Sequence, residues 1–236
     1  MTADVSPTIT APAPARARIW PRTRWWGFVL FAVVSLIHVG AITAGAEGIV
    51  YPTKLLLMPT LALAAVWALR GTRWSAPQTW LILAIGLSWL GDGAGTFFPF
   101  APTLPMMLLS FGLAHLAYMT LFLRWIRRPL PPWTAVYAVW WTAMLAVLWP
   151  HLGPLQLAVA AYGLVLGGTA ALSARGGAIT AIGGVFFLAS DTILAMRLFL
   201  PDDITGPLGG PWVMLTYTLG QGLLAFGIVR RLRTTG

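Results

Sequence analysis

Long runs of apolar residues dominate this chain, and short connections containing polar residues, glycine and proline separate them. Eight of the runs are about 20 residues long, which is the length at which an α-helix crosses the hydrocarbon core of a bilayer. The runs cover residues 25–45, 50–69, 78–98, 103–124, 131–150, 152–173, 177–200 and 210–230. This pattern predicts an all-α, polytopic membrane protein with eight transmembrane helices.

The composition agrees with a membrane protein and excludes several kinds of chemistry. Hydrophobic residues make up 58% of the 236 residues and charged residues only 9%, whereas soluble domains contain about 25% charged residues. The mean hydropathy is +0.79. Because the chain contains no cysteine, it has no disulfide framework, no thiolate nucleophile and no cysteine-based metal site.

The basic residues are distributed unevenly between the two sides of such a bundle. The net charge is +9, which a nucleic-acid-binding surface would also produce. With eight crossings, however, most Lys and Arg residues lie on one side: Arg16, Arg18, Arg22, Arg24, Arg70, Arg73, Arg124, Arg127, Arg128, Arg175, Arg230, Arg231 and Arg233. The connections on the other side contain neither. The positive-inside rule then predicts a cell-membrane protein with both termini in the cytoplasm, and we expect no nucleic-acid partner.

The chain divides into one membrane domain and two tails. Residues 1–24 are rich in Pro, Ala, Thr and Arg and predict a disordered basic cytoplasmic tail. Residues 25–230 form the eight-helix domain, and residues 231–236 form a short basic cytoplasmic tail. The small residues of AITAGAEG after the first run would also suit cleavage of a signal peptide. A retained helix is preferred, because the preceding segment is long and the run has the length of a membrane span.

Two of the six acidic residues lie inside predicted membrane helices. Asp92 and Asp191 are each about fourteen residues from the cytoplasmic start of their spans, or roughly 20 Å along a helix. We therefore expect both at the same depth, in the outward half of the membrane. An intramembrane carboxylate costs several kcal/mol unless it is protonated, paired or hydrated, so it indicates a functional site.

Five other polar side chains fall at compatible depths. Lys54 lies near the outer end of the second predicted span. His115 and Tyr118 are three residues apart and share one face of the fourth span. Tyr217 and Gln221 are one turn apart and share one face of the eighth. These depths predict one polar cavity that opens to the outer half of the membrane.

Each of these residues also has a purely structural interpretation. The glycines on either side of Asp92 would let it cap a broken helix, and Asp191 could form a structural ion pair with Arg197 or Lys54. Histidine, tyrosine and glutamine side chains often hydrogen-bond neighbouring membrane helices to one another. Two carboxylates at matched depth favour a functional site over these alternatives.

The order of polar residues also hints at an internal repeat. Asp92 is followed in the next span by HLAY, and Asp191 is followed in the next span by YTLGQ. The two carboxylates are 99 residues, or four spans, apart. The similarity predicts a weak four-plus-four parallel repeat.

Common catalytic motifs are absent from the sequence. The three histidines show no HExxH or HxxxH spacing, so we expect no metal site. The sequence has no GxSxG nucleophile motif, no phosphate-binding loop and no dinucleotide fingerprint. Carboxylate chemistry, or transport through a polar pocket, remains.

The polar segments, taken in order, resemble the YhhN family of membrane proteins. The similar segments are YPTK ending at Lys54, LSWLGD ending at Asp92, FGLAHLAY with His115 and Tyr118, FFLASDTILA with Asp191, and TYTLGQ with Tyr217 and Gln221. The resemblance extends from about residue 25 to 230. The chain departs from it where glycine follows Asp92 and where leucine follows Lys54, and these differences bear on the lining of the pocket.

Characterised members of that family are lysoplasmalogenases, so the resemblance implies a hydrolase that cleaves the vinyl ether of a lysophospholipid. Cleavage of a vinyl ether requires an acid, a negative group beside the cation and a positioned water, so we hypothesise that Asp92 and Asp191 are the catalytic pair, with either one as the acid. In this hypothesis the substrate-binding residues are Lys54, which holds the ionised carboxylate or the lipid phosphate, and His115, Tyr118, Tyr217 and Gln221, which orient water or the glycerol hydroxyl. We expect a lysophospholipid and membrane lipids as partners and no metal or organic cofactor.

A non-enzymatic function is the alternative. A small transporter or lipid-binding protein could use the same intramembrane pocket, because glycine breaks beside carboxylates also occur in proton-coupled carriers. The sequence predicts neither the lipid headgroup nor the oligomeric state.

Overall fold

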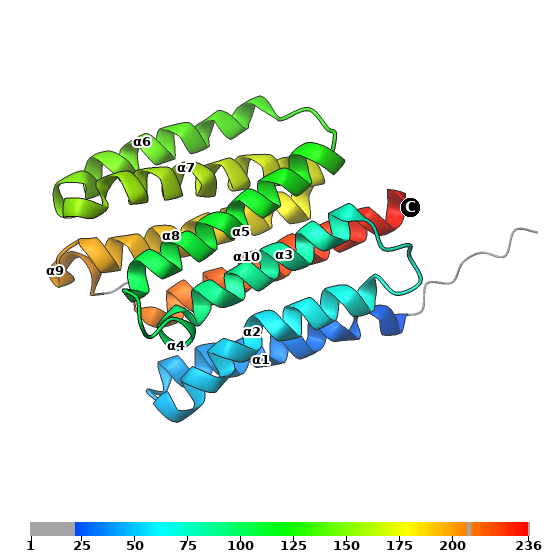
Figure 1. Cartoon of the computed structure of the whole chain (residues 1–236), viewed down its shortest axis with the longest axis horizontal. Coiled ribbons are helices and arrows are strands. Elements are labelled where there is room, and N and C mark those ends of the chain that lie inside the picture. The colour runs from blue at the N-terminus through cyan, green and yellow to red at the C-terminus, as the bar shows by residue number, and fades with distance from the viewer. Residues whose placement is uncertain (1–21, 207–208, 236) are drawn as a thin grey trace, which may run out of the picture.

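The computed structural model describes residues 22–206 and 209–235. Its long helices lie side by side and run alternately up and down the bundle (Figure 1). No strand occurs in this described part of the chain. The helices are α1 (Trp26–Thr43), α2 (Glu47–Ala68), α3 (Ala76–Asp92), α4 (Ala94–Phe97), α5 (Thr103–Trp125), α6 (Val136–Leu148), α7 (Gln156–Ser173), α8 (Ala178–Phe199), α9 (Asp202–Thr205) and α10 (Gly210–Thr235).

Helix α10 lies near the middle of the bundle and packs against α8, α1, α2 and α3. The pair α1 and α2 forms one edge, and the pair α6 and α7 forms the other (Figure 1). Helix α5 packs between α3 and α7, and α7 also packs on α8. The helices α3, α5, α7, α8 and α10 therefore follow one another around a common interior.

The all-α prediction is confirmed, and six helices of the described part are long and apolar enough to cross a membrane. These are Trp26–Thr43, Glu47–Ala68, Thr103–Trp125, Gly153–Gly176, Ala178–Phe199 and Gly210–Thr234. Helices α3 and α6 also coincide with predicted spans but have only 17 and 13 residues. The eight crossings, the cytoplasmic termini and the repeat stay predictions.

The third predicted span, residues 78–98, is two helices and not one. Helix α3 ends at Asp92, Gly93 caps it, and the short helix α4 follows. A Cβ atom at Gly91 would lie 2.6 Å from the Phe111 ring, and one at Gly93 would overlap the ring of Phe97. Two glycines therefore let aromatic rings pack against the break, and Asp92 lies at a helix end inside the bundle.

Helices α8 and α10 approach each other closely because both carry glycine at the contact. A Cβ atom at Gly183 would lie 2.7 Å from the backbone nitrogen of Leu224, and one at Gly220 would lie 2.6 Å from that of Phe187. Small residues that allow such backbone contact are a common means of helix association in membranes. The contact sets the position of Asp191 on α8 relative to Tyr217 on α10.

The two predicted tails fall at the limits of the description. Residues 1–21 of the predicted N-terminal tail lie outside the described residues, and a 3₁₀ turn covers Arg22–Trp25. At the other end, α10 continues to Thr235. Residues 231–235, predicted as a tail, thus form the last turn of a helix.

Candidate functional site

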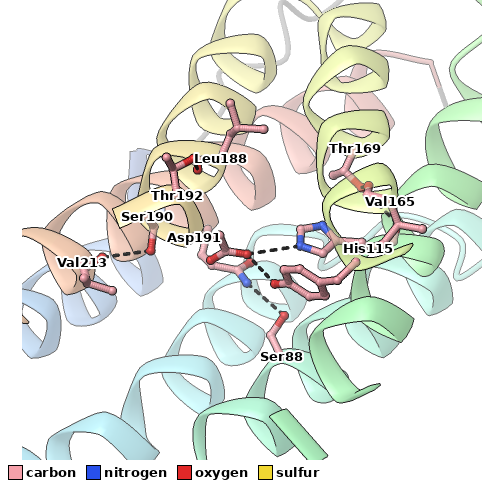
Figure 2. Close-up of polar contacts among 11 residues, drawn as sticks. Ser88, His115, Val165, Thr169, Leu188, Ser190, Asp191, Thr192 and Val213 are labelled. Carbon is pink, nitrogen blue, oxygen red and sulfur yellow. Dashed lines mark hydrogen bonds and ion pairs between the residues drawn. The ribbon is translucent and has the colours of Figure 1, made fainter. Parts of the chain in front are cut away.

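Polar side chains from several helices meet in the interior that α3, α5, α7, α8 and α10 surround. Figure 2 shows the Asp191 carboxylate directed toward the ring of His115, with Ser88 on a neighbouring helix below them. All seven residues predicted from the sequence lie in or beside this region. They form three groups of contacts.

The first group is centred on Asp191, in the middle of α8. The hydroxyl of Tyr162, on α7, donates a short hydrogen bond to its Oδ2. His115 Nε2, on α5, lies 3.7 Å from the same oxygen. Among the described residues, neither Arg197 nor Lys54 forms an ion pair with Asp191. The alternative of a structural ion pair with Arg197 or Lys54 is therefore wrong, and a tyrosine and a histidine approach Asp191 instead.

The burial of this group differs from one side chain to the next. The His115 side chain is fully buried, whereas the Asp191 side chain is 10% exposed. Neither ring nitrogen of His115 makes a hydrogen bond to any described residue. The pair therefore combines a partly exposed carboxylate with a buried imidazole whose ring nitrogens make no hydrogen bond within the described part of the chain.

The second group is centred on Asp92, at the end of α3. Tyr217, on α10, donates a hydrogen bond of 2.8 Å to Asp92 Oδ2. Both Lys54, on α2, and Asp191 interact electrostatically with this carboxylate. In the described part of the chain, no carboxylate oxygen lies within 4 Å of the Lys54 ammonium group. Lys54 thus influences Asp92 from a distance, without a direct ion pair.

The third group links α5, α10 and α3 through Gln221. The Tyr118 hydroxyl donates to Gln221 Oε1 at 2.7 Å, and Gln221 Nε2 donates to Ser88 Oγ at 2.9 Å. All three side chains are fully buried. Because Gln221 uses both ends of its amide within the protein, its geometry suits a residue that positions its neighbours.

Aromatic rings lie between the Asp191 and Asp92 groups. The ring of Phe187 is 4.7 Å from that of His115 and 5.6 Å from that of Tyr217, measured between centroids. Phe111 packs edge-on against Tyr217 at 5.9 Å. The two carboxylates therefore have separate surroundings, each including one tyrosine hydroxyl.

Two small apolar crevices reach Asp191. One, of about 50 Å³, lies among α6, α7 and α8, where Trp140, Trp141 and Met144 line it. The other, of about 40 Å³, lies among α5, α7 and α8 and includes Leu108. Tyr162 lines both crevices. The exposed part of Asp191 therefore faces apolar side chains.

Sequence reasoning missed Tyr162, Ser88 and Phe187. Tyr162 had a usable signal, since it interrupts an apolar run in the same way as Tyr118 and Tyr217. Serine and phenylalanine are common within membrane helices, so no sequence signal separated Ser88 and Phe187 from their neighbours.

The described residues include no cluster of three or more His, Asp or Glu side chains that could hold a metal ion. His115 and Asp191 are only two such groups. The expectation that the reaction needs no metal or cofactor stays a prediction.

Comparison with known proteins gives one match. No curated protein and no solved structure matches the chain. The model of the YhhN family matches residues 49–228, a stretch that contains all three groups of contacts.

Proposed function

Because the chain belongs to the YhhN family, we propose that it is a membrane-embedded hydrolase that cleaves the vinyl ether bond of a lysoplasmalogen or a related ether lysophospholipid. One observation carries the proposal: two carboxylates, each held by a tyrosine, flank the same interior, and one of them opens to apolar crevices. Paired carboxylates in different surroundings are suited to acid/base catalysis.

The proposal includes eight membrane crossings with both termini in the cytoplasm. The two short helices gain length from their neighbours, since α3 with α4 covers residues 76–97, and α6 with its flanking 3₁₀ turns covers residues 132–151. Each segment is then about 20 residues long, enough to span the hydrocarbon core. The basic residues support the orientation.

The reaction consumes one water molecule. A proton adds to the β carbon of the vinyl ether, and the α carbon and ether oxygen then share the positive charge of an oxocarbenium ion. Water attacks the α carbon and loses a proton, which gives a hemiacetal. The hemiacetal breaks its bond to the glycerol oxygen, which takes up a proton, and a fatty aldehyde and a glycerophospho-base are released. The site must supply an acid, a base and a fixed water position.

We assign the acid to Asp191, because its exposed edge lines the two apolar crevices. Tyr162 and His115 both approach Oδ2, which leaves Oδ1 to carry and deliver the proton. After the transfer, the carboxylate lies beside the oxocarbenium ion and stabilises its charge.

Asp92 then accepts the proton of the attacking water. Tyr217 orients this carboxylate through its hydrogen bond, and Lys54 acts on it electrostatically. Lys54 also lies near the outer end of its span, where it attracts the lipid phosphate. Tyr118, Gln221 and Ser88 hold α5, α10 and α3 in register around this arrangement.

Aldehyde release from a lysoplasmalogen by the purified protein in detergent tests the proposal. We expect release by the wild-type protein that depends on protein concentration. A transporter using the same pocket would release nothing, because transport requires sealed compartments and hydrolysis does not. Absence of release from folded protein, with uptake into proteoliposomes, would replace the hydrolase with the transporter.

Tyr162→Phe is expected to lower kcat by about tenfold or more, because Asp191 becomes a carboxylate as it gives its proton, and a hydrogen bond to a charged group contributes about 1.5–3 kcal/mol. The substitution removes the donor to Asp191 Oδ2 and leaves the ring that lines the crevices. The unfolding temperature should stay close to that of the wild type, because the phenylalanine ring keeps the packing of the tyrosine ring. Tyr51→Phe, on the exposed part of α2, is the matched control. A reduced rate together with an unfolding temperature well below that of the control would show that Tyr162 serves packing only.

A further inference from the structure

An apolar groove runs between α5 and α7 on the outside of the bundle, next to the Asp191 group. Its volume is about 350 Å³, and it extends from Pro105 to Leu116 on α5 and from Leu155 to Val165 along α7. Apart from Tyr162, its lining consists of leucine, valine, alanine, glycine and proline. The groove therefore offers an aliphatic surface with a single phenol at one point.

Tyr162 connects this groove with the candidate catalytic carboxylate. Its ring lines the groove, and its hydroxyl donates to Asp191. Leu108 likewise lines both the groove and the crevice among α5, α7 and α8 that reaches Asp191. The groove and the crevice at Asp191 thus share the side chains of Leu108 and Tyr162.

Gly112 keeps the groove open at that point. A Cβ atom placed on it would lie 3.8 Å from Cδ2 of Tyr162, which is ordinary van der Waals contact. An alanine would therefore fit without displacement of the ring. A longer side chain would extend across the ring and fill the middle of the groove.

The length of the groove matches the thickness of the hydrocarbon layer of one leaflet. Residues 105–116 of α5 span about 16 Å at about 1.5 Å per residue, and half of a hydrocarbon core of about 30 Å is about 15 Å. In the proposed topology, α5 and α7 both begin at the outer surface. The groove then lies alongside the lipid chains of the outer leaflet.

We propose that this groove binds the single hydrocarbon chain of the lysophospholipid substrate and that Gly112 determines whether a long chain fits. The inference rests on the proposed hydrolase and adds the binding site for the chain. The first carbons of a chain that crosses Tyr162 lie beside the crevice at Asp191, where the vinyl ether has to be. Because lipid tails are as apolar as the groove, the site orients the chain and does not extract it from water.

Gly112→Leu tests the proposal with two substrates, one with an octadecenyl chain and one with a propenyl group too short to occupy the groove. We expect the ratio of kcat/KM for the long to the short substrate to fall by about tenfold or more, because a misplaced reacting bond loses the benefit of orientation. The matched control is Gly40→Leu on the exposed side of α1, where a Cβ atom has no neighbour within 4 Å. An unchanged ratio in Gly112→Leu would overturn the proposal.

A binding measurement separates the groove from the hydrolase. The probe is a saturated alkyl-ether lysophospholipid, which has no vinyl ether to cleave, with a photoreactive diazirine on its chain. We expect labelling of α5 and α7 in the wild-type protein and its loss in Gly112→Leu. Labelling of the groove by this probe, combined with no aldehyde release from a lysoplasmalogen, would refute the hydrolase and support the chain site. Aldehyde release with labelling confined to α6 or other helices would refute the chain site alone.

Discussion

Replacement of Asp191 by asparagine is expected to lower the rate of aldehyde release by at least about a hundredfold, because a positioned acid or base contributes a factor of about 10² to 10⁴. Asparagine has the shape of aspartate, and its carbonyl oxygen still accepts the hydrogen bond from Tyr162. It has no acidic proton to give to the β carbon. Single-turnover measurement of aldehyde formation in detergent checks the expectation.

The control for this variant is Asp203→Asn, at an exposed position of the short helix α9. It removes one carboxylate from the same chain without touching the bundle interior, and its rate should equal that of the wild type. Both variants should elute as the folded protein and unfold at temperatures close to that of the wild type. Near-wild-type turnover in Asp191→Asn would eliminate this carboxylate as the acid.

Asp92→Asn is expected to reduce turnover by at least about a hundredfold for a different reason, the loss of the base that takes a proton from water. Tyr217 can still donate to the asparagine carbonyl oxygen, so the end of α3 keeps its main contact with α10. The electrostatic interaction with Lys54 is lost with the charge. Steady-state turnover of the same substrate gives the measurement.

Azide distinguishes the two roles, because it is an anion and attacks an oxocarbenium ion without the help of a base, whereas water has to give up a proton. Added azide should therefore accelerate substrate consumption by Asp92→Asn and leave Asp191→Asn slow, since the cation does not form without the acid. Acceleration of Asp191→Asn but not of Asp92→Asn would exchange the two assignments. Full activity of Asp92→Asn without azide would contradict the paired-carboxylate mechanism.

Part of the site could be read from the sequence because depth in a membrane follows from position along a helix. Asp92, Asp191, His115 and Tyr217 stood out as polar residues in apolar runs, where each has an energetic cost. The structure places all of them in one interior. Tyr162 also interrupts an apolar run, so the same signal applies to it.

The partners of each side chain could not be predicted in this way. Tyr217 binds Asp92 across 125 residues of sequence, and Tyr162 binds Asp191 from the neighbouring helix. In a parallel repeat, the two carboxylates would have partners on equivalent helices. Instead, Asp92 binds a tyrosine of α10 and Asp191 binds a tyrosine of α7. Close glycine contacts, such as that at Gly220, decide which helix faces meet.

The sequence by itself determined the all-α membrane class, the approximate helix positions and the presence of two carboxylates within apolar runs. These properties depend on run length and local polarity, because every backbone group in a bilayer must bond within its own helix. Only the tertiary structure decided that the third span breaks at Gly93, that Gln221 is enclosed, and that Asp191 opens to the crevices beside Tyr162. These features depend on the packing of helices distant in sequence, which hydrophobic periodicity along one helix does not specify.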